Sequence, residues 1–124
     1  MNIEVSNGEI VDKLTILEIK LENIKDEQKL SNLRKEYQLL DEIVATIISK
    51  DHPLYLELLG INKQLWDIED RIRELERQKD FGREFIEVAR SVYFTNDKRS
   101  EVKRKINDLT NSSLTEEKSY ESYT

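Results

Sequence analysis

The residues of this sequence that could do chemistry are charged side chains in two segments far apart in the chain. Asp12, Lys13 and Glu18 lie near the N-terminus, whereas Arg90 and Arg99 lie near the C-terminus. Guanidinium and ammonium groups brought together bind carboxylates and phosphates, and a neighbouring carboxylate can position or exchange a proton. The cations therefore form a candidate anion site, provided that the fold brings the two segments together.

Arg99 is the sharpest of these signals because, with Thr95, it interrupts a series of apolar residues at helical spacing. A guanidinium among buried apolar side chains has to be paired with a counter-charge or hydrated. One interpretation is a pocket in which Arg99, Arg90 and Lys13 hold an anionic ligand. The other is a structural ion pair, or a helix break at Thr95-Asn96-Asp97. The polar neighbours and candidate counter-charges are Tyr93, Asn96, Asp97, Asp12, Glu18, Glu69 and Asp70.

Several kinds of catalytic site lack their residues in this sequence. The single histidine, His52, falls in a predicted turn, so the Glu-x-x-His pairs of di-iron bundles are absent and we expect no metal and no cofactor. There is no cysteine nucleophile, no second histidine for a relay and no glycine-rich phosphate loop. His52 is more simply explained as part of a helix cap than as a catalytic base. The sequence therefore favours a non-enzymatic protein over an enzyme.

The composition favours long helices in an aqueous compartment. Charged and hydrophobic residues each make up 37% of the 124 residues, with only three glycines and one proline, which is typical of solvent-flanked helices. No apolar run approaches the length of about 18 residues that a membrane span needs. The absence of cysteine suits a reducing compartment, so we expect a cytoplasmic protein without membrane insertion.

The charge balance argues against nucleic acid as a partner. The net charge is −6, which opposes bulk attraction to a phosphate backbone. The one basic stretch, residues 98–105, holds five cations but no interleaved aromatic residues on which bases could stack. Cations near a helix C-terminus also complement the helix dipole, which explains this stretch without a ligand.

Four series of apolar residues at intervals of three and four predict four amphipathic helices. Ser6 and Glu9 form a capping box for the first, and Pro53 suits the first turn of the third, with Asp51 or His52 as its cap. Asp80 is the expected cap of the fourth. The four series run over residues 10–24, 30–47, 54–75 and 81–109.

Four such helices predict an all-α fold, an antiparallel helical bundle with coiled-coil-like packing. We expect one domain over residues 1–110 and a mobile or loosely docked tail over residues 111–124. Ile16 and Ile19 lie away from the main apolar stripe of the first helix and would be exposed in a simple monomer. With Trp66, which is either an interface anchor or packing at a seam edge, they form a candidate interface with a second copy or a partner protein.

A resemblance to a known family rests on four stretches, VSNGEIVDKLTILEIK, LWDIEDRIRELE, DFGREFIEVARSVYFTNDKR and SSLTEEKSY. Together they resemble, over nearly the whole chain, a family of small bacterial helical proteins of unknown function. The resemblance implies the helical fold and a link to genes for surface polysaccharide and glycosyl transfer, but no activity. It also implies a shared surface or pocket between residues 8–20 and 90–99. This chain continues past the EEKSY run with ESYT.

Two functional hypotheses follow from these observations. The leading one is a non-enzymatic interaction or assembly protein that binds itself or a partner protein, with a role in a cell-envelope glycan pathway implied by the resemblance. The alternative is a small helical enzyme or binding protein for an anionic metabolite. In that case Arg90, Arg99 and Lys13 would bind the anion and Glu69 would position or exchange a proton.

Overall fold

The computed structural model describes residues 1–115 and residue 117, and it confirms the all-α fold. Four α-helices make up about three quarters of the described residues, and no strand occurs among them. None of the helices found there is long and apolar enough to cross a membrane. The helices are α1 (Asn7–Asn23), α2 (Glu27–Ala45), α3 (Pro53–Arg77) and α4 (Arg83–Leu109).

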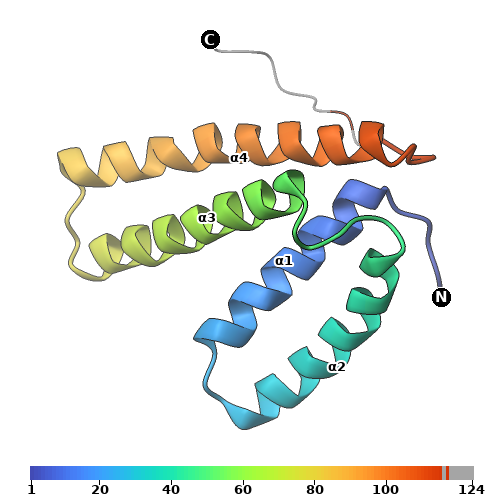
Figure 1. Cartoon of the computed structure of the whole chain (residues 1–124). Helices are drawn as coiled ribbons and strands as arrows, with labels where there is room; N and C mark the ends of the chain where they lie inside the picture. Colours follow the sequence, from blue (N-terminus) through green and yellow to red (C-terminus); the bar gives the residue numbers. More distant parts are fainter. Residues whose placement is uncertain (116, 118–124) are drawn as a thin grey trace.

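The four helices form two hairpins that lie crosswise (Figure 1). α1 pairs with α2 and α3 pairs with α4, and α1 then packs closely against α3 and α4 as well. α2 packs closely against α1 alone among the helices. At the outer end of the second hairpin, Arg71 of α3 donates hydrogen bonds of 2.7 and 2.6 Å to Glu84 of α4. α1 is therefore the helix that joins the two hairpins.

The helix starts follow local rules, with one correction. The Ser6 hydroxyl accepts from the Glu9 backbone N–H at 3.2 Å, and His52 Nδ1 accepts from the Leu54 N–H at 3.0 Å, so His52 is the cap of α3. The prediction that Asp80 caps the fourth helix is wrong, because Gly82 is the N-cap residue of α4. Asp80 instead accepts from the Gly82 N–H at 3.1 Å and closes the turn before the helix.

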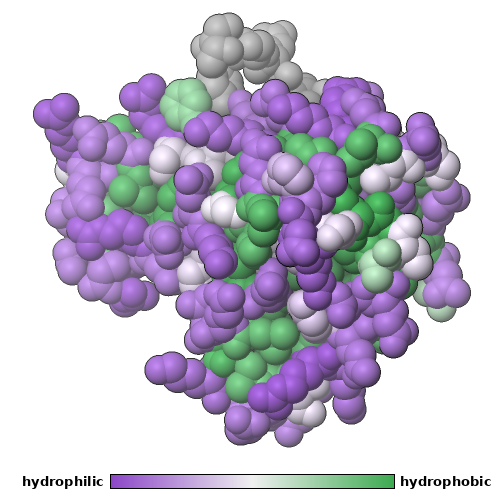
Figure 2. Space-filling view, in the orientation of Figure 1, coloured by the Kyte–Doolittle hydropathy of each residue, from purple (hydrophilic) through white to green (hydrophobic). Residues whose placement is uncertain are grey.

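The main core lies where the two hairpins meet. It is built from apolar side chains of α1, the end of α2 with the turn that follows it, the first half of α3 and the last half of α4. α2 as a whole has only two buried residues, of which Val44 belongs to this core. Figure 2 shows hydrophobic side chains at the surface low in the view, over the α1–α2 hairpin. The core residues are Val11, Leu14, Val44, Ile48, Tyr55, Leu58, Ile61, Val102 and Ile106.

The start of α1 lies against the end of α4 at very close range. The Gly8 N–H donates to Asn107 Oδ1 at 2.6 Å, and the Asn7 N–H donates to the Ser112 hydroxyl at 3.0 Å. A Cβ atom on Gly8 would lie 2.5 Å from the backbone oxygen of Lys103. These contacts hold the beginning of the predicted tail against α1, while its later part, with Tyr120, lies outside the described residues.

We predict that Gly8→Ala destabilises the fold, because the new methyl group meets backbone that cannot move without separating α1 from α4. The expected loss is about 1–3 kcal/mol in the free energy of unfolding, the usual cost of overpacking. Urea denaturation followed by circular dichroism measures it. Gly60→Ala is the matched control, because apart from its chain neighbours and the adjoining backbone of α3 no atom lies within 4 Å of a Cβ there. The control should raise stability by about 0.4–1 kcal/mol, and equal stabilities of the two variants would contradict the prediction.

Candidate functional site

A buried polar network joins α1, α3 and α4 at the crossing of the hairpins. Arg99 donates to the carboxylate of Asp12 through Nε at 2.9 Å and through a terminal nitrogen at 2.5 Å. The Asn62 side-chain amide donates to Asp12 Oδ1 and to the Thr15 hydroxyl, each at 2.8 Å. The Thr15 hydroxyl in turn donates to the backbone oxygen of Asp12 at 2.6 Å. Four side chains from three helices thus satisfy one another.

Burial makes this network a structural one. The Asp12 side chain is 1% exposed and that of Arg99 is 28% exposed. A carboxylate so deeply buried has to be paired with a counter-charge, and a bidentate hydrogen bond from a guanidinium is the strongest such pairing. No buried side-chain nitrogen or oxygen among the described residues lacks a hydrogen-bond partner. The geometry therefore favours the structural ion pair as the role of Arg99, and α4 runs unbroken through Thr95-Asn96-Asp97.

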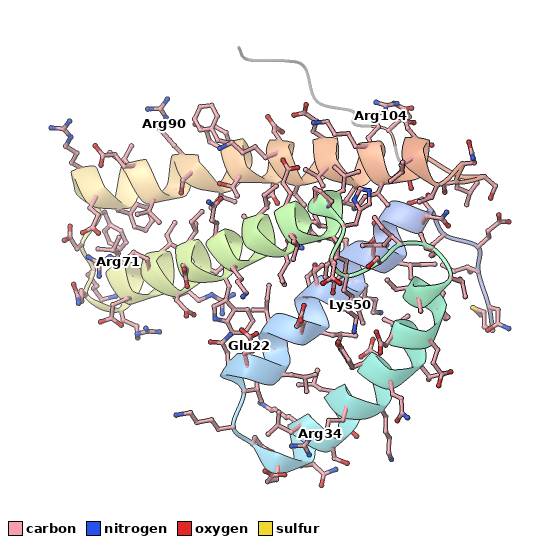
Figure 3. All side chains as sticks on the ribbon, in the orientation of Figure 1. Glu22, Arg34, Lys50, Arg71, Arg90 and Arg104 are labelled. Atoms are coloured by element: carbon pink, nitrogen blue, oxygen red, sulfur yellow. The ribbon has the colours of Figure 1, made fainter. Side chains whose placement is uncertain are left out.

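The three cations proposed to hold an anion are not brought together. The Lys13 ammonium lies 3.1 Å from Glu36, on the side of α1 that faces α2. Arg90 and Arg99 are nine residues apart on one helix, which places them on opposite faces and about 13 Å apart along the axis. Arg90 points away from α3 (Figure 3), and its Nε donates to the Tyr93 hydroxyl at 3.2 Å.

Glu18 belongs to a second polar group at the α1–α3 contact. The hydroxyl of the buried Tyr55 donates to Glu18 Oε2 at 3.3 Å. Burial, and after it the negative charge of Glu18, raise the pKa of Tyr55 well above its usual value. Nearby, burial alone would lower the pKa of Lys50, but hydrogen bonds to Asp41 and Tyr37 outweigh it and raise the pKa. The Tyr55–Glu18 bond joins α1 to α3, whereas the Lys50 contacts join the connection between α2 and α3 back to α2.

A hollow of about 380 Å³ opens beside the Asp12–Arg99 pair. Its apolar wall consists of Ile16 and Ile19 from α1 with Leu65 and Trp66 from α3. Its polar lining consists of Asn62, Glu69, Asp70 and Arg73 from α3 with Arg99 from α4. We call this hollow the Trp66 groove. It unites residues that the sequence suggested for two separate sites, the candidate interface and the candidate anion site.

The prediction that Ile19 is exposed is wrong, because this residue is only 2% exposed. Ile16 is half-buried, and both residues line the Trp66 groove. The reason is that α1 packs against three helices and therefore has no single buried face. A prediction from one apolar stripe assumes that the opposite face of the helix meets solvent.

Sequence reasoning missed Asn62 and Thr15 in the network and Arg73 at the groove. Asn62 carried a usable signal, because it lies four residues after Leu58 and three before Leu65 and so falls on the buried stripe of α3. Its neighbour in the network, Thr15, lies beside Leu14 on α1 and gave no comparable signal, since a threonine inside a helix often bonds its own backbone.

The remaining candidates lie apart from the groove. Tyr93 is exposed on the outer face of α4, and its ring lies 4.9 Å from that of Phe94. Asn96 and Asp97 are half-buried on α4. His52 borders a wider hollow of about 530 Å³ near the ends of α2 and α4. Within the described residues, no group of three or more acidic or histidine side chains is arranged to hold a metal ion.

Comparison with known proteins assigns the chain to a family. Residues 1–124 match the model of a family of unknown function, DUF6165, and the protein belongs to that family. The expected membership of a family of unknown function is thereby confirmed. Neither the curated proteins nor the solved structures with which the chain was compared include a match. The family carries no activity that could be transferred to the Trp66 groove.

We predict that Arg99→Met strongly destabilises the protein, because it leaves the buried Asp12 carboxylate without its counter-charge. The expected loss in the free energy of unfolding is about 3 kcal/mol, as for other broken buried pairs. The double variant Asp12→Asn with Arg99→Met should lose less than the sum of the two single variants. Urea denaturation of all four proteins measures this coupling, and strict additivity would contradict a direct interaction.

Proposed function

We propose that this member of DUF6165 is a non-enzymatic interaction protein that binds a segment of a partner protein in the Trp66 groove. The observation that carries the proposal is the groove itself, an open hollow whose wall combines a half-buried tryptophan with three aliphatic side chains. Large aromatic side chains in apolar pockets contribute most of the binding energy in many protein interfaces.

The size of the groove supports this proposal. Its volume of about 380 Å³ lies within the range of about 300–1,000 Å³ that is common for binding sites. Release of water from its apolar wall, when a partner side chain enters, would favour binding.

The state of the charged groups at the groove favours binding over catalysis. Arg99 is bonded to Asp12 on two nitrogens, and the Nε of Arg73 lies 3.4 Å from Glu69. Charged groups that are already paired with an opposite charge can orient a bound chain. A general acid or base, in contrast, has to reach the reacting atom. The separation of Lys13, Arg90 and Arg99 likewise weakens the hypothesis of an anionic metabolite.

The proposal places the protein in the cytoplasm, in keeping with its lack of cysteine. The family resemblance would place its partner in a cell-envelope glycan pathway. Self-association is the second form of the same proposal, because a second copy could occupy the groove or cover apolar residues elsewhere on the surface.

We predict that Trp66→Ala abolishes capture of a partner while leaving the helical fold intact. The test is a tagged pull-down from native lysate with mass spectrometry, run beside light scattering of the pure protein. Leu39→Ala is the control, because Leu39 is a large apolar residue 65% exposed on α2, away from the groove. A stoichiometric partner retained by the control and lost with Trp66→Ala supports the proposal.

Two outcomes would count against the proposed function. One is a monomer with no partner that depends on Trp66. The other is a saturable rise in Tm with dicarboxylates or nucleotide sugars that Trp66→Ala abolishes, because stabilisation by a small anion would indicate a metabolite site.

A further inference from the structure

The shape of the Trp66 groove fits a short peptide segment better than a compact ligand. The lining residues of α3 recur at helical spacing from Asn62 to Arg73. Eleven residues of helix span about 16 Å, the length of three helical turns or of about five residues of extended chain. An apolar groove of this length beside a helix is the usual form of a site that takes a peptide with one or two apolar anchors.

The charged side chains along the groove differ in whether an opposite charge lies beside them. The positive charge of Arg99 is balanced by Asp12, and that of Arg73 lies beside Glu69. Asp70 adds an exposed negative charge on the same stretch of α3. The groove is lined by two carboxylates and two guanidiniums, and because the buried Asp12 outside the lining balances Arg99, one negative charge remains. The whole chain has a net charge of −6. The field at the groove therefore favours a positively charged partner.

We infer that the groove binds a partner segment in which an apolar side chain is flanked by lysine or arginine. This inference rests on the proposed function and specifies its ligand. The apolar side chain lies against Trp66, Leu65 and Ile16. The flanking cation lies over Asp70, at the edge of the groove, where solvent reaches it.

A second copy of this chain does not offer this combination in its own basic stretch. Residues 98–105 hold five cations, but the valine among them, Val102, is 2% exposed and belongs to the core. Lys103 of the same stretch is bonded to Glu9 at 2.7 Å. The segment is therefore part of the folded body and cannot present an apolar anchor without unfolding α4.

The test uses Trp66 itself as the reporter, because it is the only tryptophan in the sequence. Two peptide sets without aromatic residues are titrated into the full chain. Both carry the same leucine anchors, flanked in one set by lysine and arginine and in the other by glutamate. We expect a saturable blue shift of tryptophan emission with the basic set and at least tenfold weaker binding of the acidic set. Binding should weaken with added salt, since the flanking charges are exposed.

Reversal of one charge tests the assignment to Asp70. Asp70→Lys should lower the affinity for the basic peptides about tenfold and raise that for the acidic ones. Glu57→Lys is the matched control, because it makes the same change of charge on α3, thirteen residues earlier. That spacing places Glu57 about 20 Å away and on nearly the opposite face. The control should retain the preference of the wild type, and circular dichroism confirms that both variants fold.

The outcomes separate this inference from the proposed function. Equal binding of both peptide sets, or an unchanged preference in Asp70→Lys, would overturn the inference while the Trp66-dependent partner stands. A dimer that dissociates in Trp66→Ala would overturn it in favour of a second copy. If no peptide changes the emission of Trp66, and Trp66→Ala still captures the lysate partner, both the inference and the proposed function are overturned.

Discussion

The arrangement of the two hairpins depends on the buried carboxylate of Asp12. This group lies on the central helix, is almost fully removed from solvent, and accepts hydrogen bonds from Arg99 of α4 and Asn62 of α3. Without such partners its burial would cost several kcal/mol. Both helices of the second hairpin must therefore reach the same point on α1. The close approach allowed by Gly8 holds the start of α1 against α4 farther along.

The burial of α1 on several sides leaves the other helices partly open. Because α3 and α4 pack against α1 and cross it, α2 can pack closely only along α1. Large apolar residues such as Leu39 and Ile43 on α2 are exposed as a result.

The Trp66 groove follows from the same crossing. Where α1 diverges from α3, side chains from the two helices cannot fill the space between them, and Arg99 and Asn62 form one polar end of the hollow. Because the network holds these two residues in place, the groove is already formed in the single chain, as the proposed function requires. A site formed in advance loses less conformational entropy on binding, which favours affinity for a short segment.

The sequence by itself determined the number and placement of the helices, the cap at Ser6, the choice of Asp51 or His52 as the cap of α3, and the unusual position of Arg99 on an apolar stripe. These features depend on neighbours three or four residues apart. Only the tertiary structure decided which of several carboxylates pairs with Arg99, since Asp12 lies 87 residues away in the chain. The crossing of the hairpins also decided that Ile19 is buried and that Lys13, Arg90 and Arg99 lie on different surfaces. Such contacts depend on how helices are oriented in space, which the spacing of residues along one helix does not specify.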